Sequence, residues 1–244
     1  MRKARDFGSS GYMHLIVRGI SRQALFEEKE DYLFYLRQLR RISSEENISL
    51  LCYCLMENHV HLLVFNSSGN ISRMMNRLGT VYAKYFNKKY NRVGHLFQNR
   101  YLNENIYNDT QLLTVFRYIL NNPVKAGICP ADRYEWNSYR FYGDSASFPD
   151  TSQLEELIGD RSAFAAFMNT PANDEACQKI ERTDRSDEWA KITIAQTLHK
   201  NGTDLQQMCR SDRNEALRKL KQQGLSIRQI ERLTGVGRNI IQRA

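Results

Sequence analysis

Two histidines, His59 and His61, lie two positions apart in the apolar segment LLCYCLMENHVHLLVF, residues 50–65. In an extended strand, residues i and i+2 project from the same face. The two imidazoles would therefore lie side by side, while Val60 faces the opposite way. Two neutral imidazoles can share a divalent metal ion, but they are an incomplete ligand set. The spacing leaves two interpretations open: half of a metal site, or two polar residues on the solvated face of a strand.

A second group of polar residues lies in DTQLLTVFRYILNNP, residues 109–123, which has helical periodicity. At about 100° per residue, the apolar stripe of this helix consists of Leu112, Val115, Phe116 and Ile119. Tyr118 lies to the side of the stripe, and Asn122 is one turn further along the same side. One interpretation is a half-buried tyrosine whose hydroxyl is in water. The other is a functional tyrosine with an amide beside it.

If that side of the helix faces the histidines, His59, His61 and the amide oxygen of Asn122 form a three-ligand site for Mg²⁺ or Mn²⁺. Tyr118 would then lie within reach of a phosphate held by the metal. A phenol with a pKa of about 10 is a poor nucleophile until a metal polarises the phosphodiester. Attack would give a 5′-phosphotyrosine and a free 3′-hydroxyl. Because the bond energy is kept, this outcome suits strand transfer better than hydrolysis.

The elements around these residues follow a recognisable order. Apolar patterns and turn residues predict strand, helix, strand, strand, helix, strand and one more helix, at 11–19, 27–46, 47–56, 59–65, 71–90, 99–107 and 109–122. This is the split βαβ order of a ferredoxin-like antiparallel sheet, an α+β fold with helices on one face. The other face is expected to be open to ligands, with the histidines on a central strand.

The segments MENHVHLLV, GHLFQNRY and FRYILNNPVKAGI occur in this order, and together they resemble the single-tyrosine HUH transposases of insertion sequences and REP elements. The resemblance runs from about Tyr12 to Tyr142. It implies that Tyr118 is the nucleophile, that His59 and His61 bind the metal and that Asn122 is the third ligand. It also implies cleavage and rejoining of single-stranded DNA near hairpins, by a monomer or a homodimer. The chain departs from the family at Glu57, where proline is common, and at Ile20, where asparagine is usual.

Basic residues indicate where nucleic acid would bind. On the helix at 71–90, positions spaced by four and seven share one face, and tyrosines and a phenylalanine are interleaved with them. This is either a phosphate track with stacking rings or a solvated basic face above an aromatic core. The candidates for DNA binding in the first part of the chain are Arg18, Arg22, Arg73, Arg77, Lys84, Lys88, Arg100 and Arg117.

The sequence predicts three parts: a catalytic domain at 1–145, an acidic helical connector at 146–190 and a tail at 191–244. Lysine and arginine number 20 against 13 acidic residues in 1–145, 4 against 10 in 146–190, and 10 against 4 in 195–244. Such basic segments suit a polyanion. The tail resembles a helix-turn-helix around Gly235. It is either a binder of duplex DNA or a hairpin stem, through Arg238, Asn239, Gln242 and Arg243, or a small structural unit.

The composition describes an ordinary globular protein, with 41% hydrophobic residues, a net charge of +8 and five cysteines. No apolar run approaches the roughly 20 residues of a membrane helix, so we expect a cytoplasmic protein with no membrane partner and with reduced thiols. The leading functional hypothesis is a metal-dependent transposase. The alternatives are a domesticated endonuclease that nicks REP hairpins, and a non-catalytic nucleic-acid-binding protein that uses the sheet face.

Overall fold

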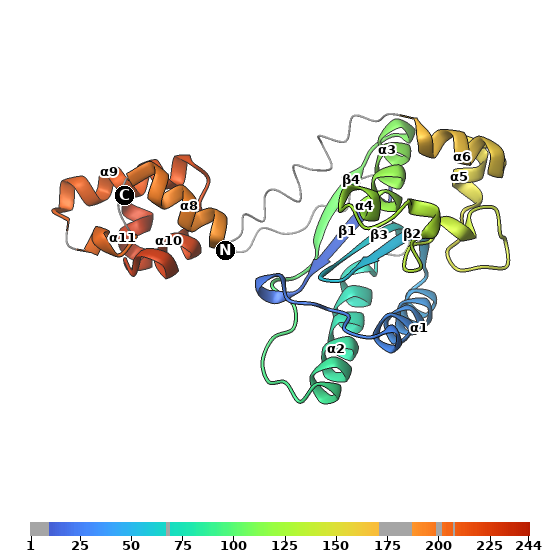
Figure 1. The fold of residues 1–244 in the computed structure, drawn as a ribbon, viewed down its shortest axis with the longest axis horizontal. Helices are drawn as coiled ribbons and strands as arrows, with labels where there is room; N and C mark the ends of the chain where they lie inside the picture. Colours follow the sequence, from blue (N-terminus) through green and yellow to red (C-terminus); the bar gives the residue numbers. More distant parts are fainter. Residues whose placement is uncertain (1–9, 67–68, 171–186, 199–201, 207) are drawn as a thin grey trace. The chain divides into compact units, whose positions relative to one another are not determined.

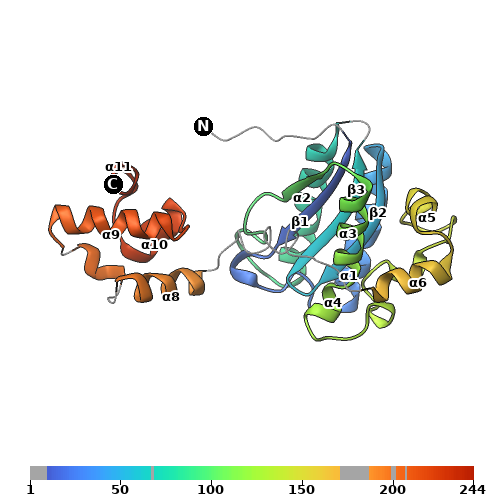
Figure 2. The ribbon, with the colours of Figure 1, turned by 90° about the horizontal axis from the view of Figure 1, so that it is seen from above.

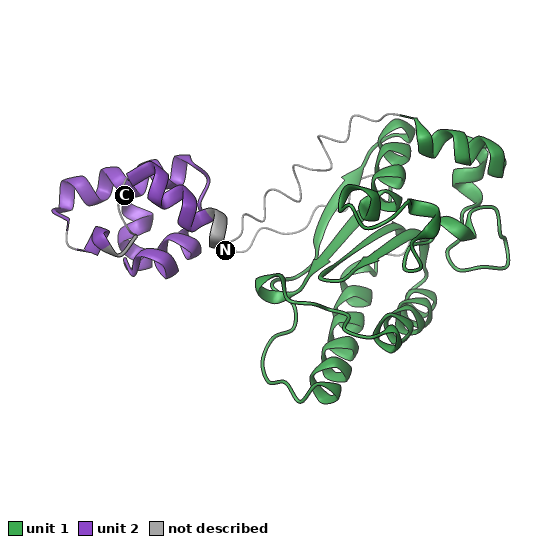
Figure 3. Cartoon of the chain, viewed as in Figure 1, with its two compact units in different colours: residues 1–178 green, residues 179–244 purple. Residues whose placement is uncertain are grey.

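The computed structural model describes residues 10–66, 69–170, 187–198, 202–206 and 208–244. The chain divides into two compact units, Met1–Gln178 and Lys179–Ala244 (Figure 3). The first unit therefore extends beyond the predicted catalytic domain and takes in much of the predicted connector. Within the described residues, no helix is both long and apolar enough to cross a lipid bilayer.

The centre of the first unit is a four-stranded antiparallel sheet (Figure 1). Its strands are β1 (Tyr12–Arg18), β2 (Ile48–Met56), β3 (His59–Asn66) and β4 (Leu102–Ile106). They lie in the order β2-β3-β1-β4, which is the ferredoxin-like arrangement that the sequence predicts. β2 and β3 form the expected hairpin, with Met56 opposite His59. The α+β fold class is confirmed, and β3 is a central strand.

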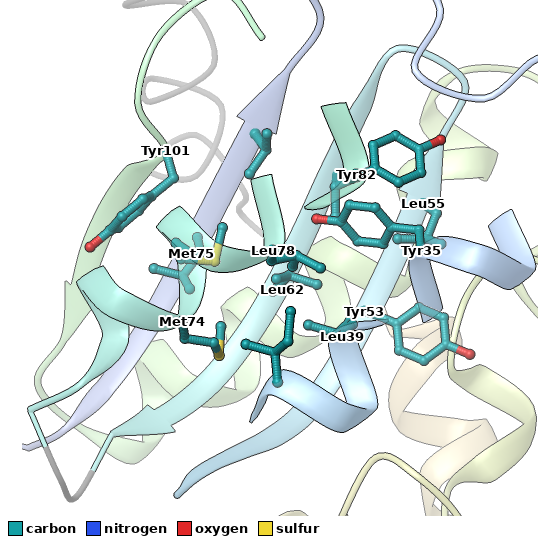
Figure 4. Packing of buried hydrophobic residues seen from close by; sticks show 14 of the residues in the cluster. Tyr35, Leu39, Tyr53, Leu55, Leu62, Met74, Met75, Leu78, Tyr82 and Tyr101 are labelled. Carbon is teal, nitrogen blue, oxygen red and sulfur yellow. The ribbon is translucent and has the colours of Figure 1, made fainter. Parts of the chain in front are cut away.

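One face of the sheet is covered by α1 (Lys29–Glu45) and α2 (Ile71–Lys89). These helices and the inward residues of the strands form an apolar core (Figure 4). Val60, Leu62 and Val64 of β3 belong to this core, as the alternation of the strand predicts. α1 begins at a capping box, in which the side chains of Glu28 and Asp31 each accept a hydrogen bond from the backbone N–H group of the other residue.

The second face, which the sequence predicts to be open, carries α3 (Asp109–Leu120) (Figure 2). α3 packs against the strand residues that point away from α1 and α2, and together they form a second apolar core. The expectation of an open face is therefore wrong, because the apolar stripe of α3 needs a partner surface. Short elements complete this side of the unit: α4 (Asn122–Lys125), η2 (Ala131–Arg133), η3 (Tyr139–Phe141), α5 (Ser152–Ile158) and α6 (Arg161–Asn169).

The predicted connector begins as part of the first unit. α5 and α6 contribute Leu154, Phe164 and Met168 to the core around α3. The Phe164 ring stacks on Tyr142, with 4.0 Å between the ring centroids. A boundary at residue 145 would cut through this packing. The remainder of the connector, from 171 to 186, lies outside the described residues.

The second unit has an apolar core of its own. It is formed by α8 (Asp187–Leu198), η4 (Gly202–Gln206), α9 (Arg210–Gln222), α10 (Ile227–Thr234) and α11 (Arg238–Arg243). Ser226 caps α10 in a capping box with Gln229, and Gly235 ends it in the left-handed conformation. The two short helices predicted around Gly235 are present, but they are part of a larger helical unit than the tail at 191–244 implies.

Candidate active site

β3 presents His59 and His61 on the face that α3 covers. Their ring centroids lie 4.9 Å apart and the rings are almost perpendicular, so the strand places them side by side as expected. His61 is fully buried, whereas His59, at the start of the strand, is half-buried. The Nδ1 atom of His59 lies 2.7 Å from Oδ1 of Asn58. Any approach to the pair from solvent therefore meets His59 first.

α3 places Tyr118 beside His61. The Tyr118 ring is edge-on to His61, with 6.0 Å between the ring centroids. The ammonium group of Lys125, from α4, lies 3.7 Å from the centroid of the Tyr118 ring. Only 1% of the Tyr118 surface is exposed, so the interpretation as a half-buried tyrosine with its hydroxyl in water is wrong. Tyr118 belongs to the same apolar core as Leu112, Val115, Phe116 and Ile119 of α3.

Asn122 begins the short helix α4 directly after α3. Its Nδ2 atom donates hydrogen bonds to the carbonyl oxygens of Tyr118, at 3.0 Å, and Ile119, at 3.3 Å. These bonds tie the amide to backbone carbonyls in the last turn of α3. They also fix the amide so that Oδ1 is the atom that remains for a ligand. The side chain is thereby tied to the backbone of the tyrosine itself.

The donor set fits a divalent ion in its chemistry. His61 Nδ1 lies 2.9 Å from Nε2 of His14, and His59 Nδ1 is bonded to Asn58. Nε2 is therefore the nitrogen through which each ring would coordinate an ion. Two imidazoles and an amide oxygen suit a borderline cation such as Mn²⁺. No group of three or more His, Cys, Asp or Glu side chains in the described part of the chain could hold a metal, so a third protein ligand for this pair would have to be of another type, such as the amide.

His14 is the member of this cluster that the sequence did not reveal. It is completely buried on β1, opposite Glu104 of β4 and diagonal to His61 of β3. Its ring stacks on the His61 ring, with 5.2 Å between the centroids. Spacing along the chain gives no hint of this contact. The predicted strand order does, because it makes β1 and β3 neighbours.

The arginines of α2 take part in the packing of the helices. Arg73 and Arg77 form ion pairs with Glu46, and Arg77 also with Glu45, both at the end of α1. Hydrogen bonds from Arg77 and Arg73 lower the pKa of Glu46 even though burial opposes the shift. These two residues therefore link α1 to α2, whereas Lys84 and Lys88 are exposed. Of the four predicted basic positions, the two lysines remain the better candidates for phosphate.

The aromatic residues interleaved with this basic face are core residues. Tyr82 and Phe86 are buried between α2 and the sheet. Tyr85 and Tyr90 donate hydrogen bonds to the buried carboxylate of Asp31, at 2.9 and 2.7 Å. Their hydroxyls and rings are thus engaged within the protein. The interpretation as an aromatic core is correct, and stacking rings for DNA are not supported here.

The other predicted basic residues differ in their surroundings. Arg117 packs on Phe167, 4.8 Å from the ring centroid, and donates to the carbonyl oxygens of Phe167 and Thr170. It therefore joins α3 to α6. Arg22 and Arg100 are exposed, and Arg18 is half-buried at the position opposite His59. Arg22 and Arg100 are available to a ligand, whereas Arg117 has a structural function.

The predicted DNA-binding residues of the tail lie on α11, and Arg238, Asn239, Gln242 and Arg243 are all exposed. Glu231 of α10 accepts hydrogen bonds from the backbone nitrogen and the guanidinium group of Arg238. This contact joins α10 to the first residue of α11. It fixes the turn and engages Arg238, so the other three side chains are the more available.

Comparison with known proteins gives a family match for the first unit and a solved structure of similar fold. Residues 8–122 match the family described as "Transposase IS200 like". A structure of a REP-associated tyrosine transposase bound to a REP hairpin is 15% identical, with a TM-score of 0.50, over 57% of this chain and 84% of that chain. A protein of Deinococcus radiodurans R1 described as a candidate transposase is 22% identical over 50% of this chain and 97% of its own, with a TM-score of 0.35. No curated protein matches the chain.

Proposed function

We propose that this chain, whose residues 8–122 match the IS200-like transposases, cleaves and rejoins single-stranded DNA through a covalent tyrosine intermediate. The observation that carries the proposal is the position of Tyr118. Its ring lies against His61, and the amide of Asn122 is bonded to its carbonyl oxygen. The contact of the phenol ring with one imidazole of the pair, and the amide tied to the backbone of the same tyrosine, are what support the proposal.

In the proposed reaction, the phenolic oxygen of Tyr118 attacks the phosphorus of a DNA phosphodiester. A bond forms between that oxygen and phosphorus, and the bond from phosphorus to the 3′ oxygen breaks. The phenol proton passes to water, and the leaving 3′ oxygen takes up a proton to become a hydroxyl. Attack by a 3′-hydroxyl on the phosphotyrosine reverses these steps and joins two strands. No external energy source is needed, because the linkage is a diester throughout.

His59, His61 and Asn122 would hold the metal, either Mg²⁺ or Mn²⁺. When bound, the ion would neutralise charge on the phosphate and on the leaving oxygen. The protein's own contribution is to fix the two imidazoles and the amide and to hold the tyrosine ring beside them. Because Tyr118 is 1% exposed, a phosphate can reach its oxygen only after α3 or α4 moves away from the sheet.

The proposed substrate is a single strand that contains a hairpin. The REP-associated transposase of similar fold is bound to a REP hairpin, and the first unit of this chain shares that fold. Exposed lysines on α2, Lys84 and Lys88, would contact the phosphate backbone. The second unit would bind the hairpin stem or duplex DNA through Asn239, Gln242 and Arg243 on α11.

The test uses an oligonucleotide with a hairpin, labelled on the 3′ side of the expected cleavage position, together with Mg²⁺ or Mn²⁺. We expect the label to become attached to the protein and to survive denaturation. Tyr118→Phe should abolish the adduct while retaining the packing of the ring, and Asn122→Ala should reduce it. Tyr107→Phe, at a tyrosine with 58% exposure, is the matched control and should react normally.

Three outcomes would contradict parts of the proposal. An undiminished adduct in Tyr118→Phe would move the nucleophile to another residue. Binding of hairpin DNA without any adduct would favour a non-catalytic nucleic-acid-binding protein. Cleavage and rejoining of REP hairpins without transfer to a second DNA would favour a domesticated endonuclease.

A further inference from the structure

Three side chains on neighbouring strands form a continuous polar chain behind the proposed metal site. Nδ1 of His61 lies 2.9 Å from Nε2 of His14, and Nδ1 of His14 lies 3.7 Å from Oε2 of Glu104. His14 is completely buried, and the carboxylate of Glu104 is partly covered. These three side chains therefore lie in a row from Glu104 on the edge strand β4, through His14 on β1, to His61 on β3.

The facing atoms of His14 and Glu104 are both buried, and neither has a hydrogen-bond partner in the described structure. Burying a polar atom without a partner costs roughly 1–3 kcal/mol. Since the two atoms face each other across 3.7 Å, a small movement of the Glu104 side chain would satisfy both. The strand pairing favours this contact, because His14 and Glu104 are directly opposite in the β1–β4 register.

The positions of the ring protons follow from this arrangement. If His61 binds an ion through Nε2, its proton must be on Nδ1, where it is donated to Nε2 of His14. His14 must then carry its own proton on Nδ1, which faces the carboxylate of Glu104. The opposite tautomer of His14 would donate to His61 and force the His61 proton onto Nε2, where it blocks coordination. A negative charge beside Nδ1 of His14 selects the productive arrangement.

We propose that Glu104 and His14 are positioning residues that hold His61 in its metal-binding tautomer and orientation. In metal-bound histidines, the N–H group of the other ring nitrogen commonly donates a hydrogen bond to a carboxylate. Here a second imidazole, that of His14, lies between the His61 ring and the carboxylate of Glu104. His59 has a simpler partner, Oδ1 of Asn58. The inference rests on the proposed function, because it assumes that His61 is a metal ligand.

The first test measures Mn²⁺ binding by calorimetry, using the full chain with Tyr118→Phe so that no reaction interferes. Loss of an outer partner of a metal-binding histidine typically lowers metal affinity by about 10- to 100-fold. We expect losses of this size for Glu104→Gln and for His14→Leu. His14→Gln keeps an acceptor oxygen for His61 and should recover part of the affinity. Glu135→Gln, at an exposed glutamate, is the control and should bind as the parent does.

The second test needs no metal. Long-range ¹H–¹⁵N spectra of ¹⁵N-histidine-labelled protein report which ring nitrogen carries the proton. We expect His61 and His14 both to be protonated on Nδ1 in the parent, and the His61 population to shift toward Nε2 in Glu104→Gln. Thermal unfolding of each variant shows whether it folds. Glu104→Gln should remain folded, because the side chain of Glu104 is partly exposed.

The outcomes separate this inference from the proposed function. If the Tyr118→Phe parent binds Mn²⁺ and Glu104→Gln and His14→Leu bind it equally well, the positioning function is overturned while the transposase remains. An Nε2 proton on His61 in the metal-free parent would also overturn it. If the parent binds no Mn²⁺ and the wild-type chain forms no adduct, the proposed function fails and takes the inference with it.

Discussion

The carboxylate of Asp31 is the most heavily bonded acidic group between α1 and α2, and its replacement by asparagine should destabilise the first unit. Asp31 is completely buried. It accepts hydrogen bonds from Tyr85, Tyr90 and Lys89, at 2.9, 2.7 and 2.7 Å. It also accepts from the backbone nitrogens of Glu27 and Glu28, both at 3.0 Å. Every one of these partners is a donor, and none suits an amide NH₂ group.

The size of the effect follows from these contacts. Removing one partner of a buried ion pair costs about 3–5 kcal/mol, and Asp31→Asn should lie near the lower end because the amide keeps one acceptor oxygen. For a unit of this size, each kcal/mol shifts the melting temperature by about 2–4 °C. We therefore expect the melting temperature of Asp31→Asn to fall by about 6–12 °C at neutral pH.

The pH dependence gives an independent check. Burial raises the pKa of Asp31, but hydrogen bonds from Lys89, Tyr90, Glu28 and Glu27 outweigh it and leave the pKa below its ordinary value. The carboxylate thus stabilises the fold fully above the unfolded pKa of about 3.9. This stabilisation is lost as the pH falls through the lower folded value. The stability gap between wild type and Asp31→Asn should be constant above about pH 5 and narrow below about pH 4.

Thermal unfolding followed by circular dichroism across this pH range measures both quantities. Glu30→Gln changes the neighbouring exposed acid on the same helix and should leave the melting temperature within about 1–2 °C, since surface substitutions rarely exceed ±0.5 kcal/mol. A fall in Asp31→Asn no larger than in this control would refute the reasoning. So would a gap that keeps its full size into strong acid.

Three further outcomes are expected. Replacing Lys84 and Lys88 by glutamine should weaken the binding of single-stranded DNA. The slope of log K against log salt concentration should become shallower by about 1.4, since each phosphate contact contributes about 0.7. Fluorescence anisotropy at several salt concentrations measures this slope, and an unchanged slope would exclude both lysines as phosphate contacts. Lys125→Met removes the ammonium group that lies 3.7 Å from the centroid of the Tyr118 ring, an interaction of about 1 kcal/mol. The rate of adduct formation in single-turnover assays should fall roughly fivefold. An unaltered rate would show that the cation does not act on the phenol. Gly235→Ala, at a φ of 69°, should destabilise the second unit by more than about 1 kcal/mol in urea unfolding, because the added Cβ would also displace the Gln206 side chain. Equal stability would mean that the turn relaxes.

Local pattern was sufficient for the sheet and for most helices. The alternation of β3 predicts that Val60 and His61 face opposite ways, and they lie in opposite layers. The turn at Glu57 and Asn58 predicts the hairpin, because polar turn residues between two apolar runs favour it. The ferredoxin-like order then follows from the sequence of elements. These features depend on contacts between residues that are near in sequence or on a well-known topology.

Contacts between distant elements could not be predicted in this way. The spacing of Arg73 and Arg77 shows that they share a face of α2, but it does not show that Glu46 ends α1 beside them. A basic stripe that is compensated by a second helix looks the same in sequence as one that faces DNA. The burial of Tyr118 has the same origin. The periodicity of α3 defines its apolar stripe. It does not show how far the sheet covers the helix beyond that stripe, and this decides whether Tyr118 is buried.

The burial of Tyr118 has a consequence for the mechanism. Tyr118, the proposed nucleophile, is 1% exposed and cannot meet a phosphate without a change in the protein around it. The middle of α3 is held on both sides, since Phe116 packs near Phe164 of α6, with 5.8 Å between ring centroids. The other end is less constrained, because Val124 and Lys125 of α4 are exposed. We therefore expect access to open at α4 rather than by removal of α3. In that case Asn122, the proposed metal ligand, would move together with the segment that exposes Tyr118, because its amide is bonded to the end of α3.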